Sequence, residues 1–210
     1  EGGFGPVPQP VDEILRDVYV EVDDMAMISD TFLNLNKLEI GQFRLDASSQ
    51  DFTSLVKKSV ERQQPAAKRA GLTLSLSAPE SLPRLRFFFD LFKMQHVMSN
   101  ILSNAIKYNN KNGTIDVSMR RDDGTVTVVV RDSGIGMDEA TLGKLFSKYT
   151  RSRDVPLSIE GHGIGMWLSK EIIDLHGGKI WAESAGAGKG SAISFSIPVR
   201  EFADGKEVHD

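Results

Sequence analysis

The sequence predicts an α+β fold that is preceded by a long helix. Apolar residues recur at helical spacing over residues 11–46, ahead of any strand pattern. A later helical pattern, over 91–108, is flanked by segments that alternate apolar and polar residues, as half-buried strands do. Two such segments meet at the turn residues Asp122-Asp123-Gly124 and predict a hairpin. These three observations favour a sheet with helices rather than an all-α or all-β chain.

Length and composition exclude several classes of protein. The 210 residues are 40% hydrophobic and 26% charged, which fits one globular unit or a domain with an appendage. A formal net charge of -4 gives no electrostatic reason to expect a nucleic-acid partner. The absence of cysteine excludes a disulfide scaffold and a thiolate metal site. No apolar run is long enough to cross a bilayer, so a cytoplasmic location is expected. Because the sequence begins without Met, a membrane segment elsewhere in a parent protein stays open.

The N-terminal part combines a linker with the long helix. Residues 1–10 are rich in Gly and Pro and predict a linker. Over residues 11–46, Leu15, Val18 and Val22 begin a heptad-like seam. Gly41 is the expected stop signal for this helix. A single helix cannot bury such a seam alone, so pairing with another helix or chain is favoured over packing on its own domain.

A second helix is expected to follow. Ser48, Ser49 and Asp51 offer N-caps for a helix that starts near residue 52 and ends at Gly71. Pro65 lacks the backbone N–H that a helix interior needs, so a kink or break is expected there.

The remaining chain alternates strands and helices. Strands are expected over 72–77, 85–89, 115–119, 126–130, 179–184 and 192–198. Helices are expected over 91–108, near 138–146, and directly after the glycines at 161–165. The polar residues 201–210 are expected to form a tail.

Two asparagines lie four residues apart on the helix over 91–108. This spacing places Asn100 and Asn104 on one face, with Lys107 and Tyr108 on the following turn. Amide oxygens are hard ligands that suit Mg²⁺, which takes few protein ligands and otherwise binds substrate phosphates and water. The alternative is that the asparagines cap or bridge neighbouring elements.

Two glycine-containing segments follow apolar elements. Asp132 ends a very apolar strand, where its carboxylate could accept an N–H from a base while Gly134 and Gly136 let the ring approach. The alternative is a turn with a capping Asp. The segment Gly161–Gly165 runs into a helix, whose unpaired N–H groups and dipole can seat a phosphate. A flexible turn is the alternative here.

Taken together, these segments resemble the conserved boxes of sensor histidine kinases. Asn100–Tyr108, Asp132–Gly136, Leu145–Tyr149 and Gly161–Gly165 are similar, in order and spacing, to the N, G1, F and G2 boxes. The closing stretch, from Leu175 to Ser191, is also similar, and the resemblance covers roughly residues 50–198. Residues 12–45 resemble the second helix of the dimerisation and phosphotransfer hairpin of this family.

The resemblance implies a Bergerat-type two-layer α/β sandwich over residues 47–200, with a mixed, mostly antiparallel sheet and helices on one face. It implies that ATP and Mg²⁺ bind there, with Asp132 on the adenine amino group, Asn104 on the metal and Asn100 beside it. Residues 150–160 would form a lid. The residues implied for ATP binding are Asn100, Asn104, Lys107, Tyr108, Asp132, Gly134, Ile135, Gly136, Phe146, Tyr149, Arg151, Gly161, His162, Gly163, Ile164, Gly165, Met166 and Ser191.

The implied partners are a phosphoacceptor helix, from the same or a partner chain, and the receiver domain of a response regulator. A homodimeric parent protein is implied as well. The 210 residues contain no His-Glu/Asp-x-x-x-Pro phosphoacceptor motif. This chain is therefore expected to bind Mg·ATP without phosphorylating itself.

Two other functions compete with a kinase domain. An ATP hydrolase of the wider superfamily, such as gyrase, MutL or the related chaperones, would have a Glu at position 100 as the general base that activates water. This sequence has Asn100, whose amide cannot accept a proton at neutral pH. A degenerate kinase kept as a dimerisation or partner-binding module is the second alternative. It is suggested by His96, where the family usually has Gln, and by Met166 and Trp167 beside the third glycine.

Overall fold

The computed structural model describes residues 42–77, 84–148 and 163–199, Val11, and the backbone of 202–203 and 206–207. The chain divides into two units, Glu1–Phe43 and Arg44–Asp210, and the fold below is that of the second. Nearly all of the expected N-terminal helix lies outside the described residues. Residues 42–47 have no regular secondary structure, so a helix does not extend through 42–46 as expected. Among the described helices, none has the length and apolar character needed to span a membrane.

A five-stranded sheet forms the centre of this unit. Its strands, in spatial order, are β2 (Thr73–Ser77), β4 (Thr114–Asp122), β5 (Thr125–Asp132), β7 (Ser191–Pro198) and β6 (Lys179–Glu183). The pair β2–β4 is parallel, and the three other pairs are antiparallel. The mixed, mostly antiparallel sheet is therefore confirmed.

The β4–β5 hairpin turns at only two residues. Asp122 pairs with Thr125, and Asp123 and Gly124 between them have φ of 37° and 75°. Positive φ at both central positions is the conformation that matches the twist of a tight hairpin, and Gly124 adopts it without steric cost. This turn fixes the register that brings Asp132 opposite Ile115 at the far end of the hairpin.

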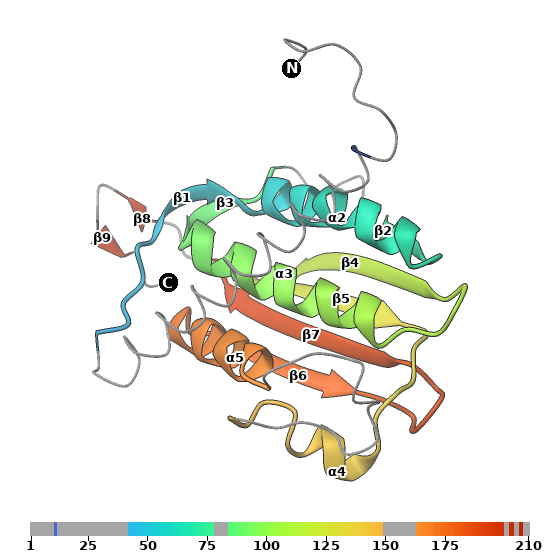
Figure 1. The fold of residues 1–210 in the computed structure, drawn as a ribbon. Coiled ribbons are helices and arrows are strands. Elements are labelled where there is room, and N and C mark those ends of the chain that lie inside the picture. Colours follow the sequence, from blue (N-terminus) through green and yellow to red (C-terminus); the bar gives the residue numbers. More distant parts are fainter. Residues whose placement is uncertain are drawn as a thin grey trace. The chain divides into compact units, whose positions relative to one another are not determined.

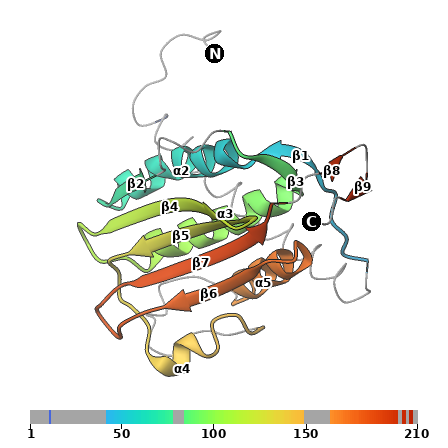
Figure 2. The same cartoon turned by 180° about the vertical axis from the view of Figure 1, so that it is seen from behind.

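Three helices cover one face of the sheet. They are α2 (Phe52–Arg69), α3 (Leu91–Lys107) and α5 (Gly165–Leu175), and Figures 1 and 2 show them on the same side. Alternate strand residues, among them Val117, Val128 and Phe195, are fully buried. Val117 pairs with the buried Val130, Val128 pairs with Phe195, and these residues form the sheet side of the core. This is the expected two-layer arrangement.

A small second sheet supports the start of α2. Strand β1 (Ser48–Asp51) pairs antiparallel with β3 (Arg86–Phe89). Phe87 and Phe89 of β3 pack against Phe52, with ring centroids 5.3, 5.4 and 5.1 Å apart within the trio. Strand β1 was not predicted, because its polar sequence indicated only helix caps.

Two further expectations were wrong in detail. Helix α2 continues through Pro65 without a break. Pro65 and Glu61 are exposed, so water can satisfy the carbonyl that loses its partner. The helix near 138–146 is shorter than expected, because α4 (Glu139–Leu142) ends at Gly143 and turns follow it. Beyond the sheet, two short strands pair within residues 201–210, β8 (Phe202–Ala203) and β9 (Lys206–Glu207).

Candidate functional site

The N-terminus of α5 differs from those of the other described helices. Helices α2, α3 and α4 are each capped by an aspartate, Asp51, Asp90 or Asp138, whose carboxylate accepts a backbone N–H three residues later. Helix α5 starts after Ile164, which makes no side-chain capping bond. Within the described residues, the first N–H groups of α5 therefore have no capping side chain and can serve an anion.

Asn100 links α3 to this open helix end. The side chain is 9% exposed, and its Nδ2 donates to Ser169 Oγ at 2.9 Å and to Met166 Sδ at 3.5 Å. A Cβ on Gly165 would lie only 2.4 Å from Asn100 Oδ1. Gly165 is thus needed for close packing against the asparagine amide. Asn100 fixes the first turns of α5 against α3.

Asn104 lies one turn further along the same face of α3. Its side chain is half-buried and makes no hydrogen bond with another residue that the structure describes. The side chain of Asn100 is instead buried, with its Nδ2 donating to α5 and its Oδ1 packed close to Gly165. Of the two, Asn104 offers the more available oxygen for a metal ion.

Asp132 lies at the end of β5, opposite Ser191 of β7. Its Oδ1 accepts the backbone N–H of Gly134 at 2.8 Å. Burial raises the pKa of this carboxyl, although hydrogen bonds from the backbone of Gly134 and Ser191 oppose the effect. A half-buried acceptor of this kind suits a neutral N–H donor such as an amino group on a base.

The loop after Asp132 is held tightly by the chain itself. Ile135 N donates to the Tyr108 carbonyl at 3.0 Å, and a Cβ on Gly134 would lie 2.2 Å from that same oxygen. Gly190 N donates to the Gly134 carbonyl at 3.1 Å. The close approach that requires glycine at 134 is therefore to the chain's own backbone. Helix α3 thus contacts both halves of the site, with Asn100 against α5 and Tyr108 against this loop.

The remaining implied residues fall into two groups. Gly163, Ile164 and Met166 lie at the start of α5. Gly136 follows the loop after Asp132, and Phe146 lies in the turns after α4. Lys107, at the end of α3, has its Nζ 5.7 Å from the centre of the Tyr108 ring. Tyr149, Arg151, Gly161, His162 and the lid at 150–160 lie outside the described residues.

Two contacts at the site were not predicted. Ser169, the partner of Asn100, is fully buried, and a serine within a helix gives no sequence signal for such a role. Lys148 Nζ lies 4.3 Å from the centre of the Trp167 ring, a cation–π distance. This contact joins the residues on either side of segment 149–162.

Comparisons with known proteins agree with this geometry. The family described as histidine kinase-, DNA gyrase B- and HSP90-like ATPase matches residues 89–201. The alginate biosynthesis sensor protein KinB of Pseudomonas aeruginosa is 28% identical over 187 residues, which are 89% of this chain and 30% of KinB. This chain thus spans about a third of that relative.

Solved structures share the fold. The catalytic domain of histidine kinase ThkA matches with a TM-score of 0.64 and 24% identity, over 73% of this chain and 98% of that one. ThkA in complex with the response regulator protein TrrA matches with a TM-score of 0.64 and 20% identity, over 94% of this chain and 54% of that one.

Proposed function

Because this chain belongs to the family of histidine kinase-, DNA gyrase B- and HSP90-like ATPases, we propose that it donates the γ-phosphoryl group of ATP to a histidine. The acceptor would lie on a dimerisation helix outside these 210 residues, because none of the four histidines lies in a phosphoacceptor motif. The observation that carries the proposal is the open N-terminus of α5 beside the two asparagines of α3.

The described residues fit ATP and a magnesium ion. Asp132 would accept the amino group of adenine, and the first N–H groups of α5 would bind phosphate oxygens. Asn104 would hold the metal through its amide oxygen, with Asn100 beside it. Mg²⁺, when bound, neutralises charge on the phosphates. The residues of this chain then act by binding and orienting, which is most of what phosphoryl transfer requires.

The chemistry favours a kinase over a hydrolase. In the transfer, an imidazole nitrogen of the acceptor forms a bond to phosphorus, the bond to the ADP oxygen breaks, and the imidazole proton leaves to solvent. Hydrolysis would instead need a base to activate water, and the side-chain amide of Asn100, whose Nδ2 donates to Ser169, cannot accept a proton at neutral pH. A degenerate, non-catalytic domain remains the alternative, and the uncapped helix argues against it, since it leaves binding groups in place.

The partners follow from the same proposal. A phosphoacceptor helix would supply the histidine, and a response-regulator receiver domain would receive the phosphoryl group from it. The complex of ThkA with TrrA supports a partner of this class. A homodimeric parent protein, anchored to a membrane by a segment outside these 210 residues, is part of the proposal. The aligned segment is 30% of the relatives KinB and WalK, whose length leaves room for such a segment.

Phosphorylation in trans tests this function. Incubation with γ-labelled ATP is expected to leave the chain itself unlabelled, and to release little phosphate. A supplied hairpin bearing the family's histidine should become labelled slowly, because effective concentration is lost when the two parts are separate. The matched control is the same hairpin with its histidine changed to alanine. An acid-labile phosphoryl group on His96, His162, His176 or His209 would contradict the account.

The fluorescence of Trp167 should report nucleotide binding. Trp167 lies on the first turn of α5 and contacts Lys148, so a nucleotide bound at the start of α5 should change its emission. Trp181 lies on β6 and pairs with Ser194, away from α5's first turn. Trp167→Phe should therefore abolish the ATP-induced signal, and Trp181→Phe should keep it. Persistence of the signal in Trp167→Phe would place the nucleotide elsewhere.

A further inference from the structure

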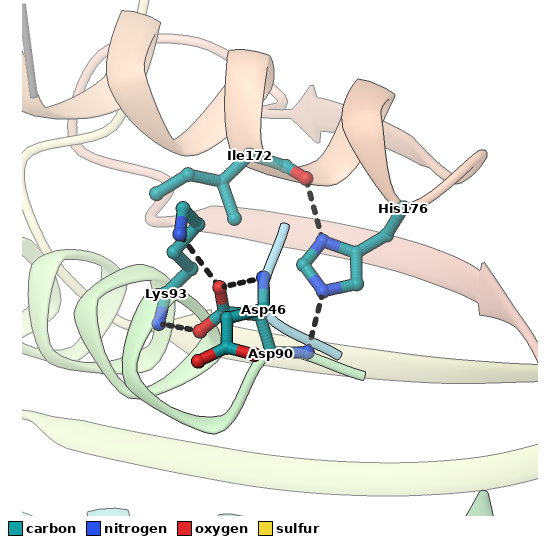
Figure 3. Close-up of polar contacts among 5 residues, drawn as sticks. All are labelled: Asp46, Asp90, Lys93, Ile172 and His176. Carbon is teal, nitrogen blue, oxygen red and sulfur yellow. Dashed lines mark hydrogen bonds and ion pairs between the residues drawn. The ribbon is translucent and has the colours of Figure 1, made fainter. Parts of the chain in front are cut away.

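A buried histidine joins the two helices of the site at their far ends. His176 caps the C-terminus of α5 and is 6% exposed. Its Nδ1 lies 2.7 Å from the Ile172 carbonyl, and its Nε2 lies 3.1 Å from the backbone N of Asp90 (Figure 3). Because Nε2 accepts the Asp90 N–H, the ring proton must be on Nδ1, where it can be donated to Ile172. The geometry therefore requires a neutral imidazole.

Asp90 extends this junction to the chain that enters the domain. The carboxylate of Asp90 is the N-cap of α3, and it also pairs with Lys93 Nζ at 2.6 Å and accepts the backbone N–H of Asp46 at 2.9 Å (Figure 3). Burial alone would raise the pKa of Asp90, but the hydrogen bonds from Lys93 and Asp46 outweigh burial and lower it. Asp90 is thus a buried, ionised and fully engaged carboxylate.

The proposed phosphoryl transfer uses neither residue, yet both lie on the helices that carry the site. Helix α3 begins where α5 ends, at Asp90 and His176, and it meets the start of α5 at Asn100. Asn100 is ten residues, or about 15 Å of helix, from Asp90. Two hydrogen bonds, one near each end of α5, therefore fix how far the helices can slide or tilt against each other.

We propose that the hydrogen bond between His176 and Asp90 positions the nucleotide site, by holding α5 in register with the asparagines of α3. This inference rests on the proposed function. Without the bond, the N–H of Asp90 would be buried without a partner, while Asn100 would still hydrogen-bond to α5 at the other end of the helix pair. Asn100 and Gly165 are in close contact, because there is no room for even a Cβ atom on Gly165. A small shift of α5 would therefore move the phosphate-binding N–H groups relative to Asn104.

A matched pair of amides tests the junction. In His176→Gln, the side chain is long enough to accept the Asp90 N–H as Nε2 does. In His176→Asn, the shorter amide can reach the Ile172 carbonyl but not Asp90. We expect ADP affinity, measured by calorimetry, to fall roughly fivefold or more in His176→Asn, as for an ordinary coupling between distant sites. His176→Gln should bind ADP with nearly the affinity of the unmutated chain. The control Leu175→Ala, which changes an exposed neighbour, should also leave ADP affinity unchanged.

A second measurement needs no nucleotide and separates this inference from the proposed function. Hydrogen exchange of the first α5 amides, such as Leu168 N, which donates to the Ile164 carbonyl at 2.9 Å, should accelerate in His176→Asn and not in His176→Gln. Unchanged exchange in His176→Asn would overturn the inference. So would equal losses of affinity in both amide variants, or lowered thermal stability with intact ADP affinity. Failure of the unmutated chain to bind ADP would instead count against the proposed function.

Discussion

Asp132→Asn should weaken the binding of ATP and ADP by more than tenfold. Losing a charge-assisted hydrogen bond from a partly buried acceptor costs about 1.5–3 kcal/mol of binding free energy. The affinities for ATP and ADP should fall by the same factor, because the two nucleotides share the adenine and differ only at the phosphates. Calorimetric titration of the folded variant measures the effect, and unchanged affinity would show that Asp132 does not hold the base.

The same substitution should stabilise the fold at neutral pH. Burial raises the pKa of Asp132 in the folded state, so its ionised form disfavours folding. The stability linked to its protonated form is fully present below the unfolded pKa, about 3.9, and is lost as pH rises through the raised folded value. The introduced amide does not ionise, so Asp132→Asn should have a higher melting temperature than the unmutated chain at pH 7. In acid, where Asp132 is protonated, the melting temperatures of the two proteins should converge. Asp122→Asn is the control, because Asp122 is exposed.

Asn104→Ala should remove most of the gain in ATP affinity that Mg²⁺ brings, while affinity in EDTA changes little. The reason is that Asn104 offers an amide oxygen without committing it to another described residue. Asn100→Ala is the matched comparison. It should weaken ATP binding both with and without Mg²⁺, since it cuts the link to Ser169 and frees the start of α5.

The two asparagines can thus be told apart by one ratio, the affinity in Mg²⁺ over that in EDTA. This ratio should collapse in Asn104→Ala and survive in Asn100→Ala. An equal loss of affinity under both conditions in Asn104→Ala would mean that Asn104 is structural. Collapse of the ratio in Asn100→Ala alone would exchange the roles of the two residues.

Elements with a strong local pattern could be predicted from the sequence. The β4–β5 hairpin has alternating residues and a turn that needs positive φ, and the N-cap at Asp51 depends only on a backbone N–H three residues away. Strand β1 could not be predicted, because only its pairing with β3 makes the polar segment Ser48–Asp51 a strand. The break expected at Pro65 was wrong because the residue type alone does not show exposure. Water at this exposed position reduces the free-energy cost of the missing backbone hydrogen bond.

The candidate site shows the same division. Spacing was sufficient to place Asn100 and Asn104 on one face of α3, and motif order was sufficient to put Asp132 at a strand end. Spacing could not show that Asn100 bonds to Ser169, 69 residues away, while Asn104 stays available. The junction of His176 with Asp90 spans 86 residues and has no local signal, although His176 stood out as part of the closing motif.

Titration of the unmutated chain with ATP, in Mg²⁺ and then in EDTA, tests the central claim most directly. The account predicts one binding site per chain, tighter in Mg²⁺, with a change in Trp167 emission that follows the same saturation curve. A folded chain that binds no ATP under either condition would contradict it and would leave the degenerate, non-catalytic domain as the better description.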